Sequence, residues 1–344
     1  MTPSPAPTPA GAGSGEVIAA SSLATPAAPT LPWGNTSPRV ADRLFRALSE
    51  GAGVLIVVLV AAIGLFLLWR AMPALARDKE NFFTYGGNWI TTNTSAMHFG
   101  IFDLLRVTVF VALFALTLAM PVALGTAIFL TQYSPRRIAG PLAYMVDLLA
   151  AVPSIIYGVW GLYVLAPRLR PIATWLNEHL GWLFLFATGN VSVSGGGTIF
   201  TAGIVLAVMI LPIITAVTRE VFIKTPQSHV EAALALGATR WEVVKTAVLP
   251  FGRSGYISGA MLGLGRALGE TVALLIILRG TQAAFGWSLF DGGYTFATKI
   301  AATASEFNNQ YKAGAYIAAG LVLFLLTFVV NAMARAAVAG KDTR

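Results

Sequence analysis

Apolar runs about as long as a bilayer is thick constrain this chain more than any other feature of its sequence. A membrane-spanning helix needs roughly 20 consecutive, mainly apolar residues, and the first such run extends from Gly51 to Trp69. Hydrophobic residues make up 56% of the chain, charged residues only 11%, and the mean hydropathy is +0.72. Because a water-soluble globule of 344 residues would carry more charge, we expect an all-α integral membrane protein.

The composition also excludes several kinds of site. The chain has no cysteine, which rules out disulfides and thiolate metal ligands, and its three histidines are scattered along the sequence. A formal net charge of +8 is compatible with nucleic-acid binding, but the basic residues are spread among loops rather than gathered in one patch. We therefore predict neither a metal site nor a nucleic-acid partner.

The hydropathy pattern divides the chain into a tail and a membrane domain. Residues 1–38 are rich in Pro, Ala, Ser, Thr and Gly, and they bury too little apolar surface to offset the entropy of ordering. A disordered cytoplasmic tail is therefore expected there, followed by a six-helix transmembrane domain over residues 39–344. The predicted spans cover residues 51–69, 107–130, 138–165, 199–217, 256–278 and 315–333.

The distribution of basic residues predicts the orientation in the membrane. Arg39, Arg43 and Arg46 precede the first span, and segments rich in Lys and Arg usually stay in the cytoplasm. In this layout 13 of the 23 Lys and Arg residues lie in cytoplasmic segments and 9 lie in or beside external loops. We therefore expect both termini in the cytoplasm, with residues 219–254 forming a cytoplasmic loop between the fourth and fifth spans.

Residues 228–250 within this loop predict two short helices. Ser228 with Glu231, and Thr239 with Glu242, both fit the capping box. In that motif a hydroxyl accepts from the backbone N–H three residues on, and the glutamate accepts from the backbone N–H of the capping residue. Each pair therefore predicts a helix start.

The same loop contains the residues that would end and orient these helices. Gly237 lies where a left-handed C-cap residue belongs, and Pro250 is expected to stop the second helix. Trp241, Val244 and Val248 follow at helical spacing, so they predict one apolar stripe. A water-facing amphipathic hairpin between two membrane spans is usually held by a partner.

The spacing within the hairpin resembles the EAA loop of the permease subunits of bacterial ABC importers. Glu231 and two alanines are followed at fixed offsets by Gly237 and by a Leu-Pro pair. In that family the loop docks into a groove on the ATPase subunit. The family commonly has isoleucine where this chain has Ala247, which softens the apolar contact without changing the spacing. The resemblance implies ATPase docking by Glu231, Ala232, Ala233, Gly237, Trp241, Leu249 and Pro250.

The fifth predicted span contains two ionisable residues, Arg266 and Glu270, where apolar residues are expected. At 100° per residue they fall within about 40° of one line along the helix, together with Gly255, Gly259 and Gly263. Small residues four apart let another helix approach closely, so this face is predicted to pack against protein or line a cavity. A charge at mid-membrane costs about 2.5 to 3.5 kcal/mol on insertion scales, so we expect these two residues to have a structural or functional role that offsets this cost.

Two interpretations of these charges are open. Arg266 and Glu270, four residues apart, could pair and only neutralise each other. Alternatively, Arg266 supplies positive potential for an anion that crosses the membrane, while Glu270 orients or releases it, and the rule that intramembrane charges are functional favours this second interpretation. Asp147, in the third span, could belong to the same pathway, partner a neighbouring helix or lie near the interface.

Two motifs resemble the C-type permeases of phosphate-specific ABC importers: residues 147–161, DLLAAVPSIIYGVWG, and residues 263–271, GLGRALGET. The likeness covers the chain from about Arg39 to its end. In that family the arginine and glutamate of the second motif, here Arg266 and Glu270, are implicated in moving phosphate. At the position of Asp147 family members can carry glutamate. The resemblance implies the fold of a type I ABC importer permease.

The resemblance also implies the partners. It predicts a complex with an A-type permease, two ATPase subunits and an external phosphate-binding protein in the bacterial plasma membrane, with inorganic phosphate as the substrate. The chain has no G-x-x-x-x-G-K-[ST] loop for a nucleotide. We therefore expect ATP and Mg²⁺ to be bound by the ATPase partner, and this subunit not to be an enzyme.

Three other functions are open from the residues alone. A permease for molybdate or sulfate would keep the hairpin but should lack the signature from Gly265 to Glu270. A proton-coupled secondary transporter could use Arg266, Glu270 and Asp147 as a proton relay, but it would not need the EAA spacing. A structural membrane scaffold would not explain a buried charge pair on a glycine face.

Overall fold

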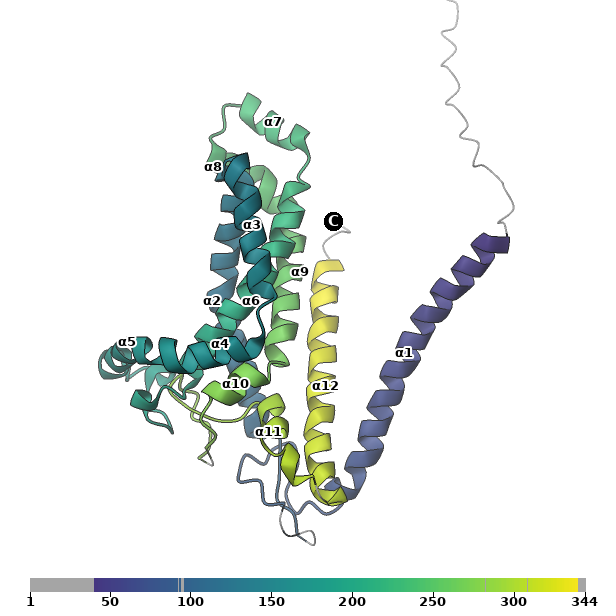
Figure 1. Cartoon of the computed structure of the whole chain (residues 1–344), viewed down its shortest axis with the longest axis vertical. Helices are drawn as coiled ribbons and strands as arrows, with labels where there is room; N and C mark the ends of the chain where they lie inside the picture. Colours follow the sequence, from purple (N-terminus) through teal and green to yellow (C-terminus); the bar gives the residue numbers. More distant parts are fainter. Residues whose placement is uncertain (1–39, 92, 94–95, 282, 308, 340–344) are drawn as a thin grey trace, which may run out of the picture. The chain divides into compact units, whose positions relative to one another are not determined.

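A computed structural model describes residues 40–339, except residues 92, 94, 95, 282 and 308. Helices make up the regular structure of the described part (Figure 1), and extended pairing within it is limited to two isolated bridges. The predicted all-α class is therefore confirmed. The tail predicted over residues 1–38 lies outside the described residues.

Twelve α-helices form in the described part of the chain. Contacts divide the chain into two compact units, residues 1–58 and residues 59–344, and the boundary falls within the first helix. All sites considered below lie in the second unit. The helices are α1 Val40–Leu75, α2 Phe102–Ile128, α3 Arg136–Ala150, α4 Ser154–Trp160, α5 Ala166–Leu180, α6 Ile199–Ile223, α7 Gln227–Ala235, α8 Arg240–Val243, α9 Leu249–Leu268, α10 Val272–Ile277, α11 Phe296–Ala302 and α12 Gln310–Ala339.

Four helical segments of the described residues are long and apolar enough to cross a membrane. They contain the first, second, fourth and sixth predicted spans. A fifth crossing is added only if one strongly bent pair of helices counts as a single span, so six uninterrupted spans are not confirmed. The four segments are Asp42–Leu75, Phe102–Tyr133, Val193–Ile223 and Gln310–Met333.

The third predicted span, residues 138–165, is wrong as a straight helix. α3 ends at Ala150, and the segments Arg137–Ala150 and Ser154–Leu180 are bent by 89°. Pro153 is the N-cap of α4 and has no backbone N–H, so the helical hydrogen bonds cannot continue through it. α4 and α5 therefore leave α3 in a new direction (Figure 1).

The fifth predicted span, residues 256–278, is also wrong as one helix. α9 already begins at Leu249 and ends at Leu268, and α10 begins at Val272. Residues 269–271 form a break between them. The sequence pattern of glycine and charge could not distinguish a broken helix from a continuous one, because both place the same residue types in the membrane.

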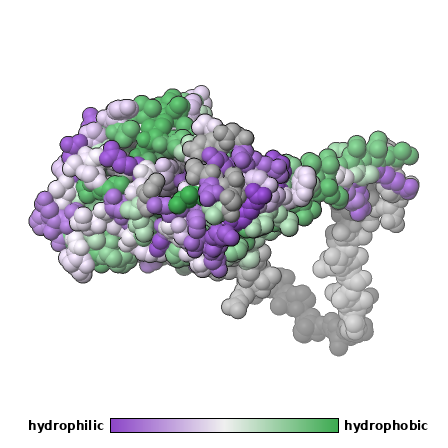
Figure 2. All heavy atoms as spheres, turned by 90° about the horizontal axis from the view of Figure 1, so that it is seen from below, coloured by the Kyte–Doolittle hydropathy of each residue, from purple (hydrophilic) through white to green (hydrophobic). Residues whose placement is uncertain are grey.

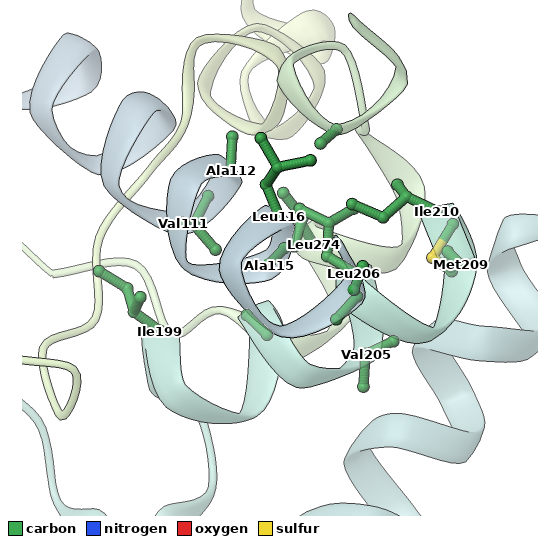
Figure 3. Packing of buried hydrophobic residues seen from close by; sticks show 14 of the residues in the cluster. Val111, Ala112, Ala115, Leu116, Ile199, Val205, Leu206, Met209, Ile210 and Leu274 are labelled. Atoms are coloured by element: carbon green, nitrogen blue, oxygen red, sulfur yellow. The ribbon is translucent and has the colours of Figure 1, made fainter. Parts of the chain in front are cut away.

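α6 is the central helix of the second unit, and α2 and α9 pack against it. Small and aliphatic side chains, among them Ala112, Ala115, Leu206 and Ile210, gather where α2 meets α6 (Figure 3). Lipid tails are as apolar as this core, so close packing of small residues rather than transfer from water holds such helices together.

Figure 2 views the molecule from below in Figure 1, and polar side chains gather on that face.

Candidate functional site

The start of α7 differs from the sequence-based prediction. α7 begins at Gln227 after Pro226, whose φ of −58° already suits the entry to a helix, and no side chain caps it. Ser228 therefore lies inside the helix, and the capping box predicted for Ser228 and Glu231 is wrong. The competing signal was the proline, which fixes the backbone two residues earlier.

The start of α8 has the predicted capping box. The Thr239 Oγ1 atom accepts from the Glu242 backbone N–H at 3.4 Å, and Glu242 Oε2 accepts from the Thr239 backbone N–H at 2.7 Å and from its hydroxyl at 2.8 Å. These hydrogen bonds favour the carboxylate, so the backbone N–H and then the hydroxyl of Thr239 lower the pKa of Glu242. The box is exposed to water.

Gly237 forms the turn between α7 and α8. Its φ is +80°, and its N–H donates to the Leu234 carbonyl at 2.9 Å while the Ala238 N–H donates to the Ala233 carbonyl at 3.1 Å. This is the Schellman pattern, which ends a helix on a left-handed residue. No atom lies within 4 Å of a Cβ placed at Gly237, so the backbone conformation rather than space favours glycine.

Pro250 does not end the second helix, which corrects the prediction. α8 continues through the π-helical turn Val244–Val248 into α9, and the Leu249 N–H donates to the Val244 carbonyl. Pro250 removes one backbone donor, but it comes directly after the π-helical turn, where the hydrogen-bonding pattern already departs from that of an α-helix, and the helix continues. Residues 240–268 thus form one continuous helical segment, which extends for roughly 40 Å at 1.5 Å per residue.

The apolar stripe predicted for the second helix divides into a buried and an exposed part. Val244 and Val248 are fully buried in a cluster with Phe222 of α6 and the end of α2. Trp241 is 54% exposed. The α7–α8 segment, residues 227–248, is therefore seated on α2 and α6 through its valines, and the tryptophan stays available at the surface.

An apolar groove of about 650 Å³ lies between α7 and the start of α9. Of the predicted docking residues, Ala232, Ala233 and Pro250 line it, while Glu231 and Trp241 are exposed outside its lining. Leu249 packs instead against the buried valine cluster. The complete lining is His229, Ala232, Ala233, Leu236, Ala238, Thr246, Ala247, Pro250 and Phe251.

The three predicted packing glycines of α9 are all buried against α6. A Cβ at Gly255 would overlap the Val221 side chain, one at Gly259 would lie 3.2 Å from the Ile214 carbonyl oxygen, and one at Gly263 would lie 2.9 Å from the Ile214 Cγ1 atom. Glycine is therefore what allows α6 and α9 to approach this closely.

Of the two predicted pathway charges, Arg266 lies just before the break that follows α9, and Glu270 lies within it. Arg266 is exposed in the last turn of α9, whereas Glu270 is 8% exposed and its Oε1 atom accepts from the Ala273 N–H at 3.2 Å. No ion pair joins the two residues in the described part of the chain. The break thus separates the pair that a continuous helix would have brought together, and Glu270 holds the first turn of α10.

α10, the helix that follows the break, lies against α4 and the turn after it. A Cβ at Gly158 would lie 2.9 Å from the Ala273 Cα atom, and one at Gly161 would lie 2.9 Å from the Ile277 side chain. The Tyr157 hydroxyl donates to the Leu149 carbonyl at 2.8 Å, which ties α4 to α3 across the bend. Sequence reasoning missed Tyr157, and the spacing of the two glycines was the only available signal for this close approach.

Asp147 of α3 has a partner on a neighbouring helix, which is one of the interpretations that the sequence left open. Its Oδ2 atom lies 3.4 Å from the Arg219 Nη2 atom of α6, and the two side chains are 45% and 22% exposed. Among the described residues, no ion pair connects Asp147 or Arg219 to Arg266. The structure therefore brings Asp147 to α6 rather than to the break.

Comparison with known proteins shows extensive similarity to one family. The family model described as "Binding-protein-dependent transport system inner membrane component" matches residues 119–341, which include the α7–α8 segment and the break. The phosphate transport system permease protein PstC 2 of Mycobacterium tuberculosis is 59% identical over 303 residues, which cover 88% of this chain and 93% of that protein.

Two further relatives carry the same description. The phosphate transport system permease protein PstC of Mycobacterium leprae is 60% identical over 317 residues, or 92% of this chain and 98% of that protein. The PstC protein of Xylella fastidiosa is 40% identical over 296 residues, or 86% and 90%. Among solved structures, an inward-facing MetNI methionine ABC transporter chain has a TM-score of 0.49 at 16% identity, covering 70% of this chain and 96% of that chain.

Proposed function

The chain belongs to the family of binding-protein-dependent transport system inner membrane components, and on that premise we propose that it is the permease subunit of an ATP-driven phosphate importer. The observation that carries the proposal is the identity of 59% to 60% with phosphate transport permeases over 88% to 92% of the chain. The subunit would form half of the translocation pathway, beside an A-type permease, with both termini in the cytoplasm. A permease in such a system is a transport subunit and not an enzyme.

Arg266 and Glu270 would act on the anion at the break. Arg266 is exposed there, and its planar guanidinium suits two oxygens of one phosphate group. An ionised Glu270 carboxylate can accept hydrogen bonds but has no proton to donate. Monohydrogen phosphate carries an O–H that can donate to such a carboxylate, whereas sulfate and molybdate at neutral pH carry none. The two side chains together would therefore favour a protonated oxyanion.

The groove on the α7–α8 segment would bind the ATPase subunit, which would also hold ATP and Mg²⁺. Its apolar lining, which includes the 89% exposed Leu236, leaves apolar surface open to a partner. Because residues 240–268 are one continuous helical segment, a displacement at the groove would reach Arg266 directly. ATP hydrolysis in the partner would thereby move the helix face that presents the arginine.

Transport by the reconstituted complex tests this proposal. Proteoliposomes would contain this subunit, the A-type permease and the ATPase, with the phosphate-binding protein added outside. We expect uptake of radiolabelled phosphate that requires ATP and is unaffected by excess sulfate or molybdate. Equal competition by those ions would assign the subunit to another oxyanion, and uptake driven by a proton gradient without ATP would overturn the importer assignment altogether.

A further inference from the structure

The C-terminal end of α3 is held by two side-chain contacts that reach different helices. Asp147 pairs with Arg219 of α6 at 3.4 Å. The carbonyl of Leu149, two residues later, accepts from the Tyr157 hydroxyl of α4 at 2.8 Å. One short stretch of α3 therefore joins α6 to α4, and we call Asp147, Leu149, Tyr157 and Arg219 the α3 relay.

The Tyr157 hydroxyl is a second donor to the Leu149 carbonyl, which also accepts from the Val152 N–H at 3.4 Å. Carbonyls in the last turn of a helix lack the usual intrahelical donors, and the contact from Val152 is long for an N–H···O hydrogen bond, so the hydroxyl at 2.8 Å is the closer donor. Tyr157 is 8% exposed, so its hydroxyl reaches the Leu149 carbonyl from within the protein. The hydrogen bond holds the two sides of the 89° bend together.

The α4 side of the relay leads to the break that contains Glu270. Gly158, directly after Tyr157, lies so close to α10 that a Cβ would be 2.9 Å from the Ala273 Cα atom. The Ala273 N–H is the donor to Glu270. A shift of α4 therefore moves the backbone that holds the Glu270 carboxylate.

The α6 side of the relay leads to the α7–α8 segment. Arg219 lies one turn before the end of α6 at Ile223, and α7 starts at Gln227. Phe222, three residues after Arg219, belongs to the buried cluster that seats Val244 and Val248. A displacement of the α7–α8 segment therefore reaches Arg219 through packed side chains.

We propose that Asp147, Arg219 and Tyr157 are positioning residues of the transport cycle, which carry a displacement of the α7–α8 segment through α3 to the break that holds Glu270. This rests on the proposed function and adds a second route to it. The continuous segment 240–268 moves Arg266, and the α3 relay moves Glu270, so the two charges reach the anion together only while the relay is intact.

Charge exchange in the complete complex tests the Asp147–Arg219 contact. Asp147→Asn should lower the number of phosphate ions imported per ATP hydrolysed by roughly five- to tenfold, with the apparent KM for phosphate unchanged. The double variant Asp147→Arg with Arg219→Asp should restore most of this ratio. The control is the exposed pair Glu220–Lys224 on the same helix, at 3.0 Å, whose variant Glu220→Gln with Lys224→Gln should behave as wild type.

The hydroxyl contact has its own matched variants. Tyr157→Phe removes only the hydroxyl that ties α4 to the Leu149 carbonyl of α3, and it should lower the same ratio. Tyr163→Phe, at a 72% exposed position in the following turn, should not. Normal coupling in both Asp147→Asn and Tyr157→Phe would overturn the proposal. An exchanged pair that assembles but remains as uncoupled as the single variant would overturn it as well. The wild-type complex, measured in parallel, tests the proposed function separately.

Discussion

Two glutamates in this chain have the same local task in opposite surroundings. Glu242 accepts from the Thr239 backbone N–H at the start of α8 in water, and Glu270 accepts from the Ala273 N–H at the start of α10 with 8% exposure. Water can replace the first hydrogen bond, but no solvent replaces the second. A hydrogen bond from a backbone N–H to a glutamate therefore contributes little to stability at the exposed start of α8, whereas at the buried start of α10 the structure depends on it.

Removal of the buried acceptor should have the largest effect. Glu270→Ala leaves the Ala273 N–H unpaired, which should cost about 1 to 3 kcal/mol of stability and abolish phosphate uptake. Glu270→Gln keeps an acceptor oxygen, so it should retain the stability and still lose transport. Thermal unfolding in detergent and uptake in proteoliposomes measure the two effects. Equal stability of the Ala and Gln variants would contradict the assigned hydrogen bond.

Tight packing between α6 and α9 should tolerate change almost as poorly. A Cβ at Gly255 would overlap Val221, so Gly255→Ala should destabilise the protein by about 1 to 3 kcal/mol. Gly265→Ala is the matched control on the same helix, because its nearest neighbour would be the Asn331 Oδ1 atom at 3.6 Å. Thermal unfolding midpoints measure the effect, and the midpoint of Gly255→Ala should be the lower of the two. Similar midpoints would show that α6 and α9 can move apart to accommodate the added methyl group.

The turn of the α7–α8 segment should respond less. Gly237 has φ +80° but open space around it, so Gly237→Ala should cost only the backbone term of about 1 to 2 kcal/mol. Gly237→Asn should cost less, since asparagine tolerates the left-handed region. Hydrogen exchange of the amides of α7 measures the local opening. An asparagine variant that opens more readily than the alanine variant would refute the conformational explanation.

The exposed capping box should give the smallest effect and a specific pH dependence. The pKa of Glu242 is lowered in the folded protein, so the stabilisation is complete above the usual glutamate pKa and is lost as the pH falls through the lowered value. The protection of the amides of residues 240–243, measured relative to their intrinsic exchange rates at each pH, should therefore fall on acidification. In Thr239→Ala the amides should exchange faster already at neutral pH, and the pH dependence should shrink. An unchanged dependence in that variant would assign it to another group.

The same comparison explains how much could be predicted from the sequence. At the surface, Thr239 with Glu242 and Gly237 specify their own caps, because short-range hydrogen bonds decide there. In the membrane, the sequence identified Arg266 and Glu270 as unusual but could not locate the break between them. That break depends on α4 and α10, whose close approach at Gly158 is a tertiary contact.

Prolines show the same limit of local reasoning. Pro250 was expected to stop a helix and Pro153 to lie within one, and both expectations are wrong. A proline removes one backbone N–H donor and fixes its own φ angle. The surrounding packing then decides whether the chain bends. At Pro250 the preceding π-helical turn lets the helix continue, and at Pro153 the Tyr157 hydrogen bond holds the bend.

Phosphate uptake by the Arg266→Gln variant tests the central claim most directly. We expect this variant to assemble, bind the ATPase and hydrolyse ATP but to import no phosphate, because the exposed cation at the end of α9 is what makes the path acceptable to an anion. Import by this variant at the wild-type rate would contradict the account.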